Sequence, residues 1–231
     1  MILKHVLPTT ATHFFTLFFL YAEIHLRLLK LPGRLYQRWP EILADVPHRI
    51  EPGRKIPILV ICKDAHHFPV TLIKIRLELR GKQYEPQKIV LSDEPQILNQ
   101  RWWDKIFYIE PPKNIGSEFL IDVFVEVIKK RRRKTIQNDN YKHSSHTSFK
   151  IRLAKTSLPA FPNQYSGDLH SHSNFTNDQV EFGASLHSMR TMAAAMGFSF
   201  VAVTDHSYDL DDKPDNYLIN DKKLTKWKML H

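Results

Sequence analysis

Cysteine is nearly absent from this sequence: Cys62 is the only one among 231 residues. A single cysteine excludes an internal disulfide framework and a cysteine-rich zinc finger. Any metal ion that the chain holds must therefore be bound by histidine and carboxylate side chains. A reducing compartment fits this composition, and we expect a cytoplasmic protein.

The sequence also lacks an apolar run long enough to cross a membrane, which takes roughly 20 residues. Its most apolar stretch, residues 14–22, is followed at once by Glu23, His25 and Arg27. Since no small-residue cleavage site follows, a signal peptide is not predicted. We predict an amphipathic helix that either packs on the body of the protein, the interpretation we favour, or binds peripherally to a membrane surface.

Acidic residues are in the minority: 24 Asp and Glu oppose 33 Lys and Arg, which gives a formal charge of +9. Such an excess favours phosphate-bearing partners or an anionic membrane surface without identifying either. Part of it is concentrated in the basic run 129–134, at the expected tip of a hairpin. Because no RNP-like aromatic pattern or basic zipper accompanies the run, a solvated loop is favoured over nucleic-acid binding.

Apolar residues make up 42% of the chain and charged residues 25%, which is typical of a globular protein with a buried core. Apolar and polar residues alternate between 53 and 155, and this period of two indicates β-strands with one buried face. Because no helical pattern intervenes, we predict an antiparallel β-sandwich of immunoglobulin-like type. The expected strands cover residues 55–62, 73–80, 88–91, 105–109, 119–128 and 148–153.

Beyond the alternating region the pattern changes. A short strand at 167–170, a helix from about 181 to 196 and an apolar strand at 198–203 predict a parallel βαβ unit. Gly197 is suited to end that helix. We therefore predict an α+β chain of two units, a sandwich and the start of an α/β barrel. Its domains are an N-terminal helical segment (1–52), the β-sandwich (53–155), a linker (156–166) and a partial barrel domain (167–231).

Histidines cluster where the last two strands end. His170 and His172 are two residues apart, which places both imidazoles on one side of the chain. His206 follows the next strand and emerges at the same edge of a parallel sheet, with Asp178 in the loop between. Three imidazoles and a carboxylate are suitable ligands for a divalent metal ion such as zinc, manganese or iron.

Three segments, DLHSHS at 168–173, Asp178 and VTDH at 203–206, resemble the start of the PHP family, the polymerase and histidinol phosphatase domains. The resemblance implies a distorted (β/α)7 barrel, truncated here, and metal-dependent phosphoester hydrolysis. It implies that His170 and His172 share one metal, while Asp178 and His206 bind another. Asp168 and Asp205 would hold the imidazoles by hydrogen bonds.

The same resemblance implies further ligands from later strands, which would lie beyond His231. We therefore expect little or no catalysis by this chain alone. A fragment, the first part of a split protein and a chain whose barrel is completed by a partner chain all fit. The substrate would be a phosphate ester or another small molecule, and metal-bound water would be the nucleophile, so no catalytic side chain is assigned.

Other functions stay open. Amidohydrolases also begin a barrel with His-x-His, but Asp205 and His206 so soon afterwards favour the PHP family. A non-enzymatic β-sandwich that binds a protein, glycan or membrane surface is the main alternative. Nucleic-acid binding through residues 129–134 is a weaker one. We expect His187, which has no metal-binding partner at helical spacing, to be structural or exposed.

Overall fold

The structure is a computed structural model that describes residues 39–82, 84–140, 146–159, 161–176, 182–214 and 216–230. Its contacts divide the chain into two units. The larger unit comprises Arg38–Asn174 and Ala184–Thr204, and the smaller unit comprises Met1–Gln37, Phe175–Gly183 and Asp205–His231. The predicted N-terminal amphipathic helix and Asp178 lie outside the described residues.

Two sheets form most of the larger unit. The first has the strand order β1-β3-β7, and the second has the order β2-β10-β8-β4-β5, with β6 paired to β4 and β9 paired to β8. Their strands are β1 (Glu41–Asp45), β2 (Arg49–Ile50), β3 (Ile56–Lys63), β4 (Val70–Gly81), β5 (Tyr84–Ser92), β6 (Gln96–Leu98), β7 (Trp102–Ile109), β8 (Glu118–Lys129), β9 (Arg132–Gln137) and β10 (Phe149–Leu153).

Strands β4 and β8 form the centre of the larger sheet. They pair antiparallel, with Leu77 opposite Val123 and Ile75 opposite Val125, and all four side chains are buried. From Ile75 to Arg80 of β4, apolar and charged side chains alternate along the strand. The strands predicted at 73–80 and 119–128 are confirmed, because a period of two places alternate side chains on opposite faces of a sheet.

Strand β3 is buried along its whole length. Ile58 and Val60 belong to the core that the two sheets share, whereas Leu59 and Ile61 pack in a second cluster with Met192. A strand covered on both faces needs apolar residues at successive positions, which is why this segment reads as an unbroken apolar run.

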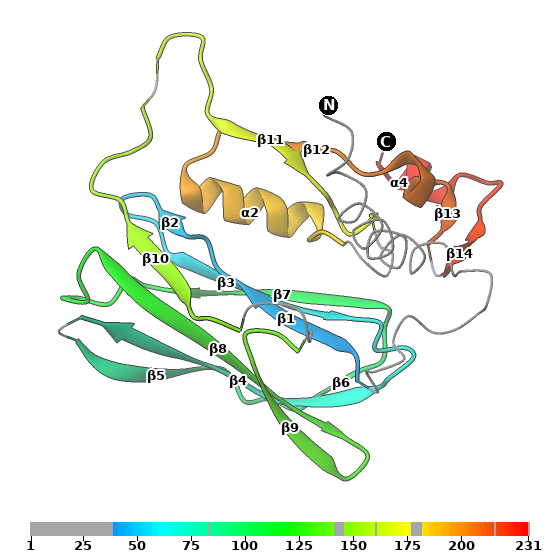
Figure 1. Ribbon diagram of the computed structural model, residues 1–231, viewed down its shortest axis with the longest axis horizontal. Helices are drawn as coiled ribbons and strands as arrows, with labels where there is room; N and C mark the ends of the chain where they lie inside the picture. The colour runs from blue at the N-terminus through cyan, green and yellow to red at the C-terminus, as the bar shows by residue number, and fades with distance from the viewer. Residues whose placement is uncertain are drawn as a thin grey trace, which may run out of the picture. The chain divides into compact units, whose positions relative to one another are not determined.

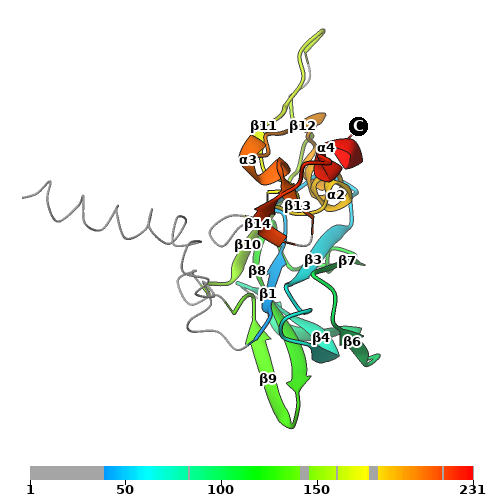
Figure 2. The ribbon, with the colours of Figure 1, turned by 90° about the vertical axis from the view of Figure 1, so that its right-hand side faces the viewer.

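Helix α2 (Leu186–Met196) packs against the second face of β3. The Ser185 side chain caps its first turn, and Gly197 ends it with φ 91°, a left-handed conformation that glycine adopts without strain. Met192 and Ala195 face the sheet and are buried. Helix α2, the three-stranded sheet and the larger sheet therefore lie as successive layers within this unit (Figures 1 and 2). The predicted end of the helix at Gly197 is confirmed.

Strands β11 (Gly167–Ser171) and β12 (Phe200–Val203) lie on either side of α2 in the sequence and pair in parallel. They form a separate two-stranded sheet with no third strand among the described residues. Phe200 and Val203 are 39% and 42% exposed, so β12 is not the buried strand that its apolar sequence predicted.

The predicted fold class, an α+β chain that begins a (β/α)7 barrel, is wrong. The residues that the structure describes are mostly strands in several sheets, with few helices and no barrel. After β12 the chain enters a short helix and an antiparallel strand pair instead of another helix and parallel strand. An apolar run cannot reveal how many strands will pair beside it, because sheet size depends on contacts distant in sequence.

The end of the segment predicted to be helical, residues 1–52, also differs from expectation. Where the structure describes it, this stretch forms β1 and β2. Residues 41–44 alternate between partly buried and buried side chains, which suits a strand that pairs with β3. The other domain boundaries predicted from the sequence stay a prediction.

The basic run forms the tip of the β8–β9 hairpin, as predicted. Lys129 pairs with Arg132 across the turn, and Lys130 has φ 56°. The ammonium group of Lys129 lies 4.4 Å from the ring centroid of Phe68, and that of Lys134 lies 5.6 Å from the ring of Trp39. Burial lowers the pKa of both lysines. Lys129 and Lys134 therefore make cation–π contacts with aromatic rings of the same unit.

The smaller unit contains α3 (Ser207–Leu210), β13 (Asp212–Lys213), β14 (Asn216–Asn220) and α4 (Thr225–Leu230). Asp221 accepts hydrogen bonds from the backbone N–H groups of Lys223 and Thr225, at 3.0 and 2.8 Å. The buried Lys226 ammonium group donates to the Asp209 carbonyl at 2.6 Å and to the Phe175 carbonyl at 3.1 Å. The Lys226 bonds therefore join α4 to α3 and to Phe175.

None of the helices in the described part of the chain is long and apolar enough to cross a lipid bilayer. The predicted cytoplasmic location and the peripheral contact with a membrane stay predictions.

Candidate functional site

The two histidines of the DLHSHS segment lie at the end of β11. Ser171 pairs with Val203 of β12, and the Thr204 N–H donates to the Ser171 carbonyl at 2.8 Å. The parallel strands therefore end side by side, and the histidines occupy the edge where they end. His170 is exposed and His172 is partly buried.

The rings of His170 and His172 lie close together, with centroids 5.2 Å apart and ring planes tilted by 43°. Since the spacing of two residues returns both side chains to one side of an extended chain, local backbone geometry alone produces this pair. Two imidazoles at this separation are near enough to contribute nitrogens to one cation, and zinc, manganese and iron all accept imidazole ligands.

Asp168 stabilises the backbone in front of this pair. Its carboxylate accepts hydrogen bonds from Ser171 Oγ at 2.7 Å and from the His170 N–H at 3.0 Å. The Ser171 bond, followed by the His170 bond, lowers the pKa of the Asp168 carboxyl. The resemblance to the PHP family implies that Asp168 holds an imidazole, whereas these hydrogen bonds fix the main chain that carries His170.

In the smaller unit, Asp205 and His206 are both joined to the buried Thr176. The Thr176 hydroxyl donates to Asp205 Oδ1 at 2.9 Å, and the His206 N–H donates to Thr176 Oγ1 at 3.2 Å. Thr176 therefore fixes the start of α3, where His206 is the residue before the helix.

The His206 ring is oriented by two side chains of α3. Its Nδ1 lies 3.2 Å from Oδ2 of the buried Asp209 and 2.8 Å from the Tyr208 hydroxyl. The Tyr208 ring stacks on the imidazole, with centroids 4.8 Å apart. Because Nδ1 is engaged, any metal coordination by His206 would use Nε2, and carboxylates commonly hold metal-binding histidines in this way.

Sequence reasoning did not single out Asp209. The acidic composition of residues 207–212 is typical of a solvated loop, a substrate-site lining or a cation site, yet the Asp209 side chain is buried. The signal was the spacing of three residues between His206 and Asp209, which brings two side chains together on one turn of helix.

The predicted ligands are divided between the two units. His170 and His172 belong to the larger unit, and His206 belongs to the smaller one. Asp178 lies outside the described residues. Over the ranges that the structure describes, no three His, Cys, Asp or Glu side chains come together as a metal site. The imidazole pair and the oriented His206 are therefore each suited to bind a metal ion, but only as separate groups.

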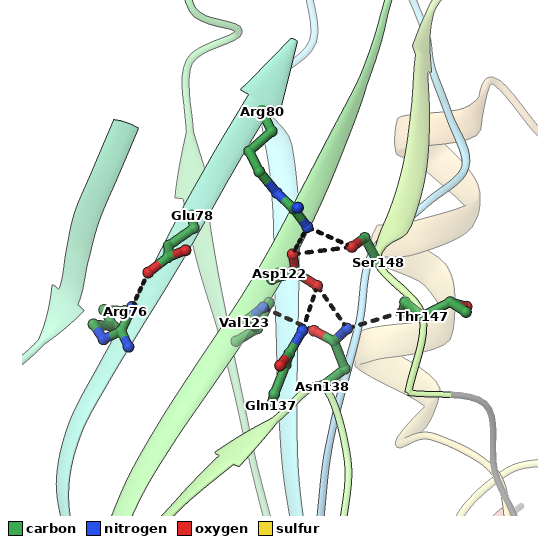
Figure 3. Close-up of polar contacts among 9 residues, drawn as sticks. All are labelled: Arg76, Glu78, Arg80, Asp122, Val123, Gln137, Asn138, Thr147 and Ser148. Atoms are coloured by element: carbon green, nitrogen blue, oxygen red, sulfur yellow. Dashed lines mark hydrogen bonds and ion pairs between the residues drawn. The ribbon is translucent and has the colours of Figure 1, made fainter. Parts of the chain in front are cut away.

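A different polar cluster surrounds the buried carboxylate of Asp122 on β8. Figure 3 shows the side chains that converge on it: Asp122 accepts hydrogen bonds from Gln137 at 3.1 Å, Asn138 at 3.1 Å and Ser148 at 3.0 Å, and forms an ion pair with Arg80. Burial by itself raises the pKa of this carboxyl, but these four partners outweigh it and lower the pKa. A carboxylate with so many donors is a structural anchor, since buried charges persist only when they are paired.

Two other features have structural explanations. Trp102 and Trp103 pack against the two apolar clusters of the larger unit, one on each side of the sheet. His187 is exposed on α2 and lines a pocket beside that helix.

Comparison with known proteins gives little guidance to function. No family model matches the chain, and no curated protein matches it. One similar solved structure is a protein of Bordetella pertussis given the name ApaA, with 7% identity, a TM-score of 0.34, and coverage of 51% of this chain and 98% of the other. Another is the CARDB domain of the PF1109 protein of Pyrococcus furiosus, in complex with di-metal ions, with 16% identity, a TM-score of 0.26, and coverage of 54% and 97%.

Proposed function

We propose that the chain binds a divalent metal ion through His170 and His172 and contributes part of a metal-dependent phosphoesterase site, with little or no hydrolysis by this chain alone. The observation that carries the proposal is the 5.2 Å separation of the two imidazole rings at the end of β11. Asp168 fixes the backbone under this pair, so little conformational freedom is lost when a cation binds.

The resemblance to the PHP family implies a second metal ion, bound by Asp178 and His206 of the smaller unit. Asp209 supports His206 in this role, because its carboxylate lies against Nδ1 and leaves Nε2 as the nitrogen that would coordinate. Divalent cations held by such residues lower the pKa of bound water and neutralise charge on phosphoryl oxygens. Zinc, manganese and iron are the candidates, since each accepts imidazole and carboxylate ligands.

Zinc titration of the metal-stripped chain tests the metal site. We expect His170→Ala and His172→Ala each to weaken zinc binding about tenfold or more, because a lost ligand costs at least as much as a lost supporting residue. His48→Ala is the matched control, because His48 is exposed and distant in sequence from the motif. Equal zinc affinity in the parent and the His170→Ala/His172→Ala double variant would reject the proposal.

Hydrolysis is tested separately, with p-nitrophenyl phosphate and added zinc or manganese. We expect little or no turnover by this chain alone. In a protein extended past His231 we expect turnover that is lost on His170→Ala and reduced on Asp209→Asn, which weakens the orientation of His206. Zinc binding without metal-dependent turnover by the extended protein would retain the metal site and reject the hydrolase assignment.

The alternative is a non-enzymatic binding module built on the larger unit. One observation favours it: a basic pocket on that unit that shares no residue with the proposed metal ligands.

A further inference from the structure

A pocket of about 550 Å³ lies beside α2, entirely within the larger unit. Residues 53–57, just before and at the start of β3, form one side, and α2 forms another, with Tyr108 near the end of β7. Small-molecule sites typically have volumes of roughly 300–1,000 Å³. The space is therefore larger than a single inorganic anion needs and suits an organic ligand.

The charged side chains that line the pocket are all basic: Arg54, Lys55 and Arg190, with His187 as a titratable neighbour. No acidic side chain lines it. Lys55 does form an ion pair of 2.9 Å with Glu110, but its two side chains are 60% and 71% exposed. Such a pair contributes little, so the Lys55 ammonium group can exchange Glu110 for a bound anion.

Helix periodicity explains how α2 contributes to this pocket. His187, Arg190 and Ala194 are spaced by three and four residues, so they share one exposed face, while Met192 packs against Leu59 and Ile61 of β3. Arg54 approaches from the segment before β3. Two guanidinium groups on different elements can each bind phosphate oxygens in a planar, bidentate manner, which lysine does not do.

Apart from Thr191, the rest of the lining is apolar or aromatic. Pro57 is buried, and Tyr108 is 54% exposed. Aromatic side chains stack on planar rings, and an exposed tyrosine next to a cationic cluster offers such a face. The pocket therefore combines groups that attract several negative charges with a surface for a flat ring.

We propose that this pocket binds a nucleotide, with the phosphates held by Arg54, Lys55 and Arg190 and the base resting on Tyr108. The site is independent of the proposed metal centre, because it needs none of His170, His172 or His206.

The test is titration of the full chain with ATP in EDTA at physiological salt, which removes metal-dependent effects and suppresses weak surface attraction. We expect one-to-one binding that Arg54→Glu and Arg190→Glu each weaken about tenfold or more. Arg131→Glu makes the same charge change on the exposed hairpin tip and is expected to alter the affinity by no more than about twofold. Folding of each variant is checked by circular dichroism and thermal unfolding.

A second comparison tests the role of the base. Tyr108→Ala is expected to weaken ATP binding about fivefold or more, the loss of one stacked base, and to leave tripolyphosphate binding unchanged. Absence of saturable ATP binding, or equal weakening by Arg131→Glu and Arg190→Glu, would overturn the proposal. So would tight binding of a single-stranded oligonucleotide with no binding of ATP, which would indicate a nucleic-acid surface instead.

Discussion

The Ser188 hydroxyl donates a hydrogen bond to Oδ2 of Asp104 over 2.7 Å, although 84 residues separate the two in the sequence. The Ser185 hydroxyl donates to the same oxygen at 2.6 Å. One carboxylate on β7 thus fixes the first turn of α2 against the three-stranded sheet. Together with the Leu59, Ile61 and Met192 contacts, these bonds explain why α2 covers that sheet.

Replacing Asp104 by alanine should loosen α2. The substitution removes the acceptor of the Ser188 hydroxyl, and because Ser188 is buried, water cannot readily replace it. We therefore expect the free energy of unfolding to fall by about 1–3 kcal/mol. Urea unfolding of Asp104→Ala measures this. Asp93→Ala, at an exposed position, should change the free energy by less than about 0.5 kcal/mol. Similar losses in the two variants would show that the hydroxyl bonds contribute nothing.

Gly197→Ala should destabilise the larger unit for two reasons. Gly197 has φ 91°, and a Cβ at this position would collide with the Glu51 carboxylate. Left-handed strain alone costs about 1–3 kcal/mol, and the displaced Glu51 side chain adds to it. Gly53→Ala separates the two effects, because Gly53 has φ 74° with nothing near its Cβ position. In thermal unfolding, Gly197→Ala should therefore have a lower midpoint temperature than Gly53→Ala. The reverse order would contradict the predicted clash.

Asp122→Ala removes the acceptor shared by Gln137, Asn138 and Ser148 and leaves Arg80 without its ion pair (Figure 3). We expect a loss of about 1–3 kcal/mol in the free energy of unfolding, because the buried Asn138 loses an acceptor, whereas the Arg80 side chain is 45% exposed and can be solvated. Asp139→Ala, at the residue that follows Asn138, is the comparison variant. A loss below about 1 kcal/mol for Asp122→Ala would show that water replaces the missing carboxylate.

Asp221 should make the smaller unit sensitive to acid. Hydrogen bonds from the Thr225 hydroxyl, the Thr225 N–H and the Lys223 N–H lower the pKa of its carboxyl to about 2. Because this folded-state pKa is below the ordinary value of about 3.9, the stabilisation is complete above about pH 4 and is lost as the pH falls towards 2. A carbon-detected NMR titration of the Asp221 carboxyl measures the midpoint, and a midpoint near 4 would contradict the prediction. Asp221→Asn should remove this part of the acid sensitivity of α4.

Local patterns determined a large part of the fold. The alternation of residues 73–80 and 119–128, the glycine that ends α2 and the turn in the basic run were all readable, because strand period, helix caps and hairpin turns depend on near neighbours in the sequence. The pairing of His170 with His172 is local in the same way. Asp209 was within reach too, since three residues separate it from His206.

The sequence by itself thus determined individual strands, the end of one helix and one imidazole pair. Only the tertiary structure decided that α2 lies on β3, that β11 and β12 pair without a barrel, that Asp104 binds Ser188, and that Arg54 and Arg190 line one pocket. Each of these relationships joins segments that are far apart in the chain. Whether such segments meet depends on how whole sheets and helices pack. The free energy of that packing comes from many residues and not from any single motif.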